Sequence, residues 1–180
     1  MLQPDDGKLR LMNVNDLEMV LEWRNSDRIR ANMYNDHVIS FDEHNAWFKR
    51  QKSGESSRYL VFELMGRPVG LVYFVDIDHK NSKAFWGFYL GYEDLPSGSG
   101  TLLGKLGVDY AFNCLGIKKL CGEAFAFNKS SIRFHKKLGF VEEGRLVRHV
   151  LKNGEFEDIV SFALFKEDWQ KQKITKCCLE

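Results

Sequence analysis

A short glycine-rich segment is the first feature of this sequence that could bind a ligand. Gly98, Ser99, Gly100 and Thr101 follow Pro96-Ser97, between a predicted strand and a predicted helix. Glycines let backbone N–H groups turn toward an anion, and the start of the following helix adds partial positive charge. The segment lacks the lysine of a Walker loop and does not follow the first strand, as a Rossmann fingerprint does. It therefore predicts a pyrophosphate site made of backbone amides, with a plain Gly/Ser connection as the alternative.

A second group of polar residues lies between residues 128 and 140. Asn128 follows a predicted strand and caps a predicted helix, which Leu138-Gly139-Phe140 ends. From Lys129 to Lys152 the chain carries seven Lys or Arg residues and two Glu residues, an excess of five positive charges in a chain of net charge +1. This half of the molecule is expected to bind a negatively charged ligand, the alternative being an ordinary solvated face.

The elements that must hold these residues follow from the spacing of apolar side chains. Alternating patterns predict strands at 8–13, 58–64, 69–77, 83–90 and 118–127, and Asn153-Gly154 predicts a type I′ hairpin between two further strands. Helical spacing predicts helices at 16–25, 27–33, 40–52, 101–115 and 130–138. The third helix opens on the capping box Ser40-Phe41-Asp42-Glu43. This order predicts a single domain over residues 1–180 of the α/β or α+β class, with a mixed sheet and helices on both faces.

The overall charge and hydropathy exclude several partners. Lys and Arg total 26 and Asp and Glu total 25, so no net field draws the chain to nucleic acid or to a membrane surface. The longest apolar runs, such as 69–75, are shorter than the roughly 20 residues that cross a bilayer. Met1 to Gly7 lacks the pattern of a signal peptide. We expect a cytoplasmic protein with no nucleic-acid partner and no membrane partner.

The four cysteines show no metal-binding spacing. Cys177 and Cys178 are adjacent in a polar tail, and Cys114 and Cys121 are expected in the core as reduced thiols. Neither a disulfide framework nor a zinc site is expected. The five histidines are scattered, so no metal is predicted.

The order of the motifs resembles the GNAT superfamily of acyl-CoA N-acetyltransferases. The resemblance spans nearly the whole chain and consists of a strand, the Gly98-x-Gly100 loop and a helix, followed by a strand, Asn128, Ser131, His135 and Leu138-Gly139-Phe140. It implies the GNAT fold, a mixed and mostly antiparallel sheet in which the strands at 83–90 and 118–127 splay apart. The pantetheine arm of acetyl-CoA would enter between them. Leu95 stands where the family usually carries Gln or Arg, a difference that binding by backbone amides should tolerate.

The resemblance assigns the cofactor and the chemistry to numbered positions. It places acetyl-CoA, as co-substrate, on Phe88, Tyr89, Leu90, Gly98, Ser99, Gly100, Thr101, Asn128, Ser131, His135 and Lys136. Acetyl transfer needs a neutral amine, donors for the oxyanion and a proton for the departing thiolate. His135 stands where the family often carries a proton-donating Tyr, and it is the expected donor, with Tyr89 in reserve. Glu123 is the expected base. The alternatives are a surface role for His135 and Glu123 and packing for Tyr89.

The N-terminal segment, residues 22–47, indicates the class of acceptor substrate. The segment carries Glu22-Trp23-Arg24-Asn25, then Arg28, Arg30 and Met33, then Ile39-Ser40-Phe41, His44 and Trp47. This pattern is similar to the PseH group, and the resemblance implies acetylation of the 4-amino group of a UDP-linked dideoxy-amino sugar, as in the pseudaminic acid pathway of flagellin glycosylation. Some protein-modifying relatives share the Trp-Arg-Asn start at Trp23. The UDP-amino sugar is expected on Arg24, Asn25, Arg30, Met33, His44, Trp47 and Trp86. The two tryptophans would offer a stacking face to the base, and packing in the core is the preferred alternative for them.

Arg24 and Arg30 can bind one diphosphate only if the helix between them breaks. Six residues turn a regular helix by about 600°, so the two side chains cannot share a face of one helix. A break near Ser26-Asp27 is therefore required. The alternative is that one or both arginines pair with surface carboxylates: Asp27, Asp36 or Glu22.

The sequence thus predicts a cytoplasmic, acetyl-CoA-dependent N-acetyltransferase of a UDP-amino sugar, with a homodimer as a possible assembly. A protein or peptide N-acetyltransferase of the ribosomal type is the first alternative. A non-catalytic acyl-CoA-binding module is the second.

Overall fold

The computed structural model describes residues 2–52 and 55–177 of the 180-residue chain. The chain divides into two compact units. Unit 1 comprises Met1–Val75 and Gly87–Gly107, and unit 2 comprises Asp76–Trp86 and Val108–Glu180. Two strands and one helix continue from one unit into the other. The single domain over 1–180 stays a prediction.

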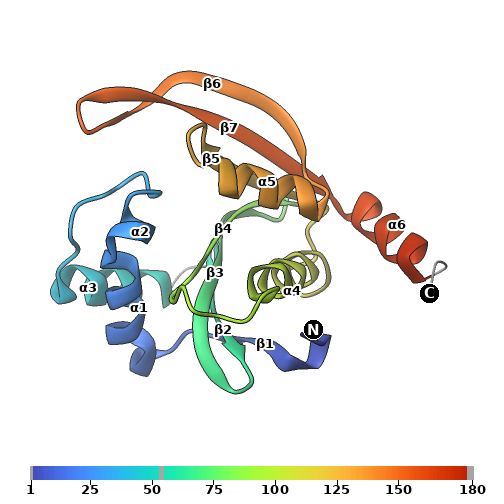
Figure 1. Ribbon diagram of the computed structural model, residues 1–180, viewed down its shortest axis with the longest axis horizontal. Helices are drawn as coiled ribbons and strands as arrows, with labels where there is room; N and C mark the ends of the chain where they lie inside the picture. The colour runs from blue at the N-terminus through green and yellow to red at the C-terminus, as the bar shows by residue number, and fades with distance from the viewer. Residues whose placement is uncertain (1, 53–54, 178–180) are drawn as a thin grey trace. The chain divides into compact units, whose positions relative to one another are not determined.

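Each predicted strand and helix is present, and one helix was not predicted (Figure 1). The strands are β1 (Gly7–Leu11), β2 (Arg58–Leu64), β3 (Arg67–Asp78), β4 (Lys83–Leu90), β5 (Lys119–Phe125), β6 (Val141–Lys152) and β7 (Glu155–Phe165). The helices are α1 (Leu17–Asn25), α2 (Asp27–Arg30), α3 (Phe41–Lys52), α4 (Ser99–Asn113), α5 (Lys129–Leu138) and α6 (Lys166–Cys177). Single 3-10 turns occupy Pro4–Asp6 and Val14–Asp16. The helix missed from the sequence is α6.

The seven strands form one mixed sheet, in the order β1-β2-β3-β4-β5-β7-β6. β1 with β2, β2 with β3, β5 with β7 and β6 with β7 are antiparallel, and β4 with β5 is parallel. The parallel register joins Lys83–Trp86 to Lys119–Gly122, although β4 continues to Leu90 and β5 to Phe125. The predicted fold class, a mixed and mostly antiparallel sheet with this strand pair, is confirmed.

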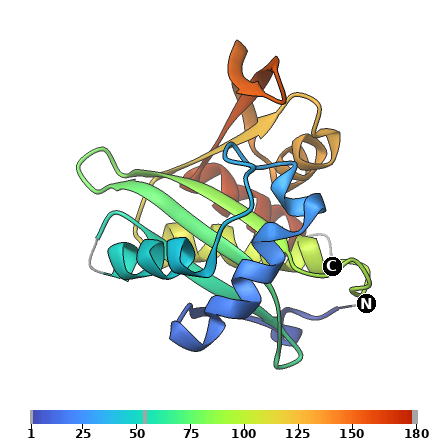
Figure 2. The same ribbon diagram turned by 90° about the vertical axis from the view of Figure 1, so that its left-hand side faces the viewer.

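The strands of unit 1 carry helices on both faces. On one face, Leu17, Val20 and Trp23 of α1 pack with Val61 and Leu71. Figure 2 shows α1 and α3 crossing the strands on this side. On the other face, Leu102 and Leu103 of α4 pack with Phe62, Leu64 and Val69. Burial of these apolar side chains, each contributing about 1.5–3 kcal/mol, holds the three layers together.

In unit 2, the unpredicted helix α6 is hydrogen-bonded to α4. Trp169 Nε1 donates to Asp109 Oδ1 at 2.7 Å, and Lys166 Nζ donates to the Phe112 carbonyl at 2.8 Å. Both acceptors lie at the end of α4, so the last helix is joined to the fourth. Residues 166–177 lack a regular apolar stripe, which is why the sequence pattern did not reveal the helix.

The expectation that Cys114 lies in the core is wrong. Cys121 is buried, but Cys114 is exposed because it follows the last residue of α4, Asn113, and leaves the apolar face of that helix. Cys178 and the side chain of Cys177 lie outside the part of the chain that the structure describes. Within the described ranges, no helix is long and apolar enough to span a membrane, and no cluster of His, Cys, Asp or Glu could hold a metal ion.

A partly buried ion-pair cluster ties β1 to its neighbours. Arg10 donates to both oxygens of Asp16 at 2.7 Å and to Glu63 Oε1 at 2.6 Å. These bonds, with Lys8, hold the pKa of Glu63 below its ordinary value. Burial raises the pKa of Asp16, but the hydrogen bonds from Arg10 and from the Asn13 amide outweigh burial and leave that pKa lowered.

Acid should destabilise the fold through these two carboxylates. A carboxyl group whose pKa is lower in the folded chain stabilises the fold above its unfolded pKa, and this contribution is lost as the pH falls. The unfolded values are 3.8 for Asp16 and 4.5 for Glu63, so the free energy of unfolding should decrease from about pH 5 downward. Urea unfolding of the wild type and of Asp16→Asn between pH 3 and 7 measures the effect. Equal pH slopes in the two proteins would contradict this prediction.

Candidate active site

The glycine-rich segment forms the start of α4 in unit 1. Gly98 has φ +97°, a conformation that favours glycine, and Ser99 Oγ donates to the Pro96 carbonyl at 2.6 Å. Leu102 N donates to Gly98 O at 2.9 Å, the first hydrogen bond of the helical ladder. The amides of Gly100 and Thr101 lie in the preceding turn, at the positive end of the helix dipole. This is the geometry that binds an anion through backbone N–H groups.

The backbone of β4 at residues 88–90 also belongs to unit 1. The Leu90 carbonyl accepts a hydrogen bond from Arg28 Nη2 at 2.8 Å, and Arg28 also pairs with Glu93 at 3.2 Å. The side chain of Tyr89 is buried beneath α1. Burial raises the pKa of Tyr89 above its ordinary value, Tyr73 adds to the rise and Arg24 opposes it. The hydroxyl of Tyr89 therefore stays protonated at neutral pH.

Three side-chain nitrogens of unit 1 are buried without a hydrogen-bond partner among the described residues. They are Trp23 Nε1 and Arg24 Nη1 on α1 and His44 Nε2 on α3. Most buried polar groups in proteins are paired, so a group of unpaired ones needs an explanation. Trp and Arg nitrogens are donors only, so what is missing is an acceptor.

The environment of Arg24 is unusual for a guanidinium group. Its Nη2 donates to the Asn35 carbonyl, and the nearby charge of Asp36 acts on the guanidinium. Burial lowers the pKa of Arg24, while the nearby Tyr89 and Tyr73 raise it. The group keeps its charge at any accessible pH. Arg24 is therefore a half-buried cation whose Nη1 has no hydrogen-bond partner in the part of the chain that the structure describes.

His44 is placed beside Arg24 at the end of a row of aromatic rings. The imidazole is 4% exposed, and burial together with the charge of Arg24 lowers its pKa, so the ring is neutral at pH 7. It stacks on Trp47 with a centroid separation of 4.9 Å, and Trp47 meets the edge of Tyr59 at 4.7 Å. Tyr59 in turn stacks on Tyr73, its register partner on β3. Trp47 and Met33 pack against the core of unit 1.

The predicted break between α1 and α2 is present. Ser26 is extended, with φ −60° and ψ 140°, and the charge of Arg30 is close enough to lower the pKa of Arg24. Arg30 nevertheless donates to the exposed carboxylate of Asp27, as the alternative foresaw. Asn25 is occupied: its amide donates to Ile39 O at 2.8 Å and accepts from Ile39 N at 2.9 Å. Asn25 therefore positions the chain before α3, and the structure gives no support for substrate contact.

In unit 2, Asn128 caps α5 as predicted. Its Oδ1 accepts from the Ser131 amide at 3.0 Å, and Gly139 ends the helix with φ +94°. Lys136 is exposed and pairs with Glu142 at 3.2 Å. Glu123 is half-buried on β5, opposite Ser161 of β7.

The structure argues against His135 as proton donor. Its ring is 2% exposed, and Nδ1 donates to the Ser131 carbonyl at 2.8 Å. Its Nε2 must therefore be the acceptor for Trp86 Nε1, 3.3 Å away. Burial lowers the pKa of His135 to about 4. A neutral ring with both nitrogens bonded inside the core has no proton to give at neutral pH.

Trp86 is likewise a core residue, which agrees with the packing expected for the tryptophans as the alternative and removes Trp86 from the sugar site. It is 5% exposed and stacks on Phe140 with a centroid separation of 5.2 Å. Its partner in the β4–β5 register is Gly122, where a Cβ atom would lie 2.6 Å from His135 Nε2 and 2.9 Å from Trp86 Nε1. The absent side chain of Gly122 is what lets the two rings meet.

Residues 9–160 match the family model "Acetyltransferase (GNAT) domain". The spermidine N(1)-acetyltransferase of Escherichia coli (strain K12) is 27% identical over 162 residues, 90% of this chain and 87% of that protein. The putative ribosomal N-acetyltransferase YdaF of Bacillus subtilis (strain 168) is 28% identical over 108 residues, 60% of this chain and 59% of that protein. A crystal structure of spermidine N-acetyltransferase from Vibrio cholerae in complex with CoA and spermine covers 92% of this chain and 99% of its own, with TM-score 0.87 and 22% identity. At that identity the likeness concerns the fold alone.

The chain belongs to the GNAT acetyltransferase family. It is an acyltransferase that uses acetyl-CoA as co-substrate. The superfamily predicted from the sequence is confirmed, but the narrower resemblance to the PseH group is not supported. The relatives described above are polyamine and ribosomal-type enzymes.

Sequence reasoning missed two parts of this region. Trp23 was noted only as part of a motif, and its unpartnered Nε1 depends on tertiary burial that no spacing reveals. His44 and Trp47 were predicted from the sequence, but the contact of Trp47 with Tyr59 was missed. The common face of Tyr59 and Tyr73, one on each of two adjacent predicted strands, was the available signal.

The state of His135 can be checked directly. Because its folded pKa is about 4, its ring should stay neutral through the range where an ordinary histidine, with a pKa near 6.5, gains a proton. Histidine ring signals recorded by NMR from pH 7.5 to 4.5, with His135→Gln used to assign the peak, test this. A midpoint near neutrality for the assigned peak would restore His135 as a candidate proton donor.

Proposed function

We propose that the chain acetylates the primary amine of a small acceptor that also carries an anionic group, and that a UDP-linked amino sugar represents this class. The observation that carries the proposal is the half-buried Arg24, whose Nη1 has no acceptor. The proposal keeps the expected cytoplasmic location.

The argument rests on the cost of unpaired buried donors. Leaving one such group without a partner costs about 1–3 kcal/mol, and more for a charged group. A phosphate or carboxylate oxygen would pair with Arg24 Nη1, and charge-assisted bonds of this kind are the strong ones. A fully protonated polyamine offers only N–H donors and positive charge. It could neither satisfy Arg24 nor avoid its repulsion.

The neighbours of Arg24 suit a polar ligand with a flat ring. His44 is neutral, so its unpartnered Nε2 can donate to or accept from a hydroxyl or a base edge. The Arg24 guanidinium and the Trp23 indole add two donors. Arg30 supports the proposal less, because its guanidinium is already paired with Asp27.

The start of α4 supports the placement of the acetyl-CoA pyrophosphate. The open geometry at Gly98 and the first-turn amides of Gly100 and Thr101 provide donors and partial positive charge without a lysine. The other proposed contacts to acetyl-CoA are those assigned from the sequence: Phe88, Tyr89, Leu90, Ser99, Asn128, Ser131 and Lys136. His135 is left out because its ring is occupied in the core.

For the chemical step we keep two of the three predicted residues. Glu123, half-buried on β5, is the proposed base for the acceptor ammonium. Tyr89 is the proposed proton donor, because its phenol is protonated at neutral pH and it is the reserve acid expected from the sequence. Burial raises its pKa, so it is a weaker acid than an ordinary tyrosine. Backbone N–H groups at 88–90 would stabilise the oxyanion.

The acetyl-CoA site is tested by Gly100→Val. A branched side chain in the first turn of α4 should obstruct the approach of pyrophosphate to the amides and weaken acetyl-CoA binding about tenfold or more. Titration calorimetry measures the affinity. Gly144→Val is the matched control, since a Cβ atom there meets nothing within 4 Å. Unchanged affinity in a folded Gly100→Val protein would remove the loop from the site.

The acceptor class is tested by Arg24→Met, which keeps the volume and removes the charge. The KM for a UDP-linked amino sugar should rise by one to two orders of magnitude, about 1.4–2.8 kcal/mol, while the KM for acetyl-CoA stays unchanged. Arg30→Met is the comparison, and it should have a smaller effect because Arg30 is paired with Asp27. UDP should compete with the acceptor, and less strongly at high salt.

A polyamine is the second candidate acceptor. The Escherichia coli relative that aligns with 90% of this chain, at 27% identity, is a spermidine N(1)-acetyltransferase. Turnover of spermidine without inhibition by UDP would select it and overturn the anionic acceptor. Turnover of a peptide N-terminus would instead select the ribosomal type.

A further inference from the structure

The end of β4 is joined to α2 by an arginine that the proposed function does not use. Arg28 Nη2 donates to the Leu90 carbonyl at 2.8 Å, and Arg28 Nε pairs with Glu93 at 3.2 Å. Leu90 is the last residue of β4, and Glu93 lies in the segment that leads from this strand to α4. Arg28 therefore connects a helix of unit 1 with the strand that is proposed to carry contacts to acetyl-CoA.

The Leu90 carbonyl points to the edge of β4 that faces away from β3. The Gly91 amide donates to the Val69 carbonyl of β3 at 2.8 Å. Because the C=O and the N–H of one trans peptide point in opposite directions, the Leu90 carbonyl must point away from β3. We call this side of the strand the open edge, because the register of β4 with β5 ends at Trp86.

The open edge also carries the backbone groups that are proposed to bind the thioester. Neighbouring residues of an extended strand turn their N–H and C=O groups to opposite edges. The Tyr89 carbonyl lies toward β3, 2.7 Å from the position that a Cβ atom of Gly70 would take. Phe88 and Leu90 therefore turn their N–H and C=O groups to the open edge. Arg28 is thus bonded among the donors that are proposed to hold acetyl-CoA.

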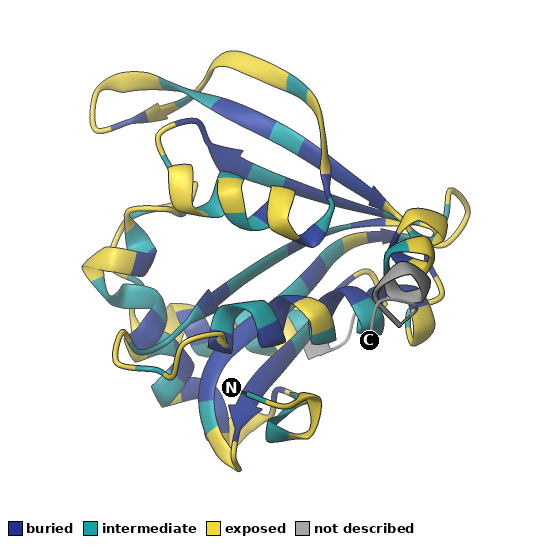
Figure 3. Cartoon of the chain, turned by 45° about the vertical axis from the view of Figure 1, so that its right-hand side comes forward, coloured by how far each residue is buried: buried dark blue, intermediate teal, exposed yellow. Residues whose placement is uncertain are grey.

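The backbone that carries Arg28 is anchored in the core of unit 1. Ile29, the next residue of α2, is 3% exposed and packs in the same cluster as Tyr89. The Arg28 side chain itself is 40% exposed. Figure 3 shows buried and exposed residues side by side on the helices in this way. The hydrogen bond to the Leu90 carbonyl is charge-assisted, whereas Glu93 is 80% exposed, so the ion pair contributes little.

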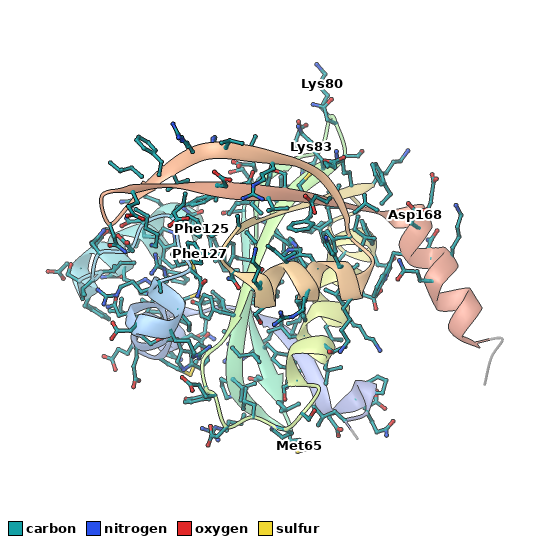
Figure 4. The ribbon with its side chains drawn as sticks, turned by 45° about the horizontal axis from the view of Figure 1, so that its top comes forward. Met65, Lys80, Lys83, Phe125, Phe127 and Asp168 are labelled. Atoms are coloured by element: carbon teal, nitrogen blue, oxygen red, sulfur yellow. The ribbon has the colours of Figure 1, made fainter. Side chains whose placement is uncertain are left out.

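Aromatic packing holds the turn that follows β4. The indole ring of Trp23 lies over Gly91, where a Cβ atom would be 2.3 Å from Trp23 Cε2. The same indole meets the Tyr92 ring edge-on, with a centroid separation of 5.6 Å. Arg67, two residues after Met65 at the β2–β3 turn (Figure 4), has its guanidinium 4.5 Å from the centroid of the Tyr92 ring. Packing therefore fixes the turn, and the hydrogen bond to the carbonyl fixes the end of the strand.

We propose that Arg28 is a positioning residue for acetyl transfer. By holding the Leu90 carbonyl, it fixes the direction of the open edge, so that the amides of Phe88 and Leu90 point at the acetyl group and the pantetheine arm. The planar guanidinium binds the carbonyl and the Glu93 carboxylate at the same time, through two N–H groups of one rigid fork. This inference rests on the placement of acetyl-CoA on β4 under the proposed function.

Calorimetry with two ligands tests this role. Arg28→Met should weaken the binding of acetyl-CoA about tenfold, because the donors of the open edge lose their preset direction. The nucleotide part of CoA, 3′-phospho-ADP, lacks the pantetheine arm, so its affinity should stay unchanged. Arg28→Lys keeps the charge but not the fork, and it should behave like Arg28→Met. Unchanged acetyl-CoA affinity in a folded Arg28→Met protein would overturn the proposal. Equal weakening of both ligands would also overturn it, since Arg28 would then act through its charge on the phosphates.

Two matched variants separate the bond to the Leu90 carbonyl from other effects of Arg28. Lys49 is exposed on α3, so Lys49→Met removes a positive charge elsewhere in unit 1. Glu93→Gln removes the exposed ion pair and keeps the bond to the Leu90 carbonyl. Both variants should bind acetyl-CoA as the wild type does. A loss in Glu93→Gln as large as that in Arg28→Met would assign the effect to the ion pair and contradict the proposal.

Amide hydrogen exchange distinguishes the failure of this inference from the failure of the proposed function. In Arg28→Met, residues 88–92 should exchange faster than in the wild type, while β2 should keep its rate, because the loss is local. An equal rise in both segments, or no rise at 88–92, would overturn the role of Arg28 itself. Faster exchange at 88–92 with unchanged acetyl-CoA affinity would instead overturn the proposed placement of acetyl-CoA on β4, and the inference with it.

Discussion

Trp86 and His135 meet across Gly122, and the packing of unit 2 depends on this contact. A side chain at position 122 would collide with both rings, so a larger residue there would force the core apart. Phe140 stacks on Trp86, and Phe162 stacks on His135 at 4.8 Å, which joins α5 to β4, β5 and β7. Trp86 and Gly122 are also the last partners of the β4–β5 register. The same contact therefore marks where the two strands stop pairing.

Hydrogen bonding inside the core distinguishes polar groups that have a structural role from those that could bind a ligand. His135 looked like a catalytic residue from its position in the motif, yet both its nitrogens have partners inside the core. Arg24 is half-buried and His44 is buried, but each retains a nitrogen with no partner among the residues that the structure describes. A buried group that is fully bonded contributes to stability, whereas a group left unpaired costs stability and is retained where a ligand completes it. On this criterion, the side chains of α1 and α3 are the better indicators of the acceptor.

The family is indicated by the match over most of the chain, whereas the choice of acceptor depends on a few side chains. The match over residues 9–160 and the polyamine relatives establish a GNAT acetyltransferase. They do not settle the acceptor, because one fold serves many substrates and specificity depends on particular side chains. A half-buried arginine whose Nη1 has no acceptor among the described residues is poorly suited to a polycation. The positive charge of Arg24 would repel spermidine, the substrate named for the Escherichia coli relative, and this repulsion is the reason for proposing a different acceptor.

Apart from α6, the sequence alone determined the elements and their order, because the hydrophobic period, the Ser40 capping box and the Asn153-Gly154 turn are local signals. It also located the glycine-rich start of α4, since conformational freedom at Gly98 is a property of the residue itself. It could not determine which polar side chains are buried or paired. The neutral state of His135, the core position of Trp86, the use of Asn25 by Ile39 and the exposure of Cys114 each depend on neighbours distant in sequence or on where a helix ends. Burial and hydrogen bonding across elements set these properties, so only the tertiary structure decided them.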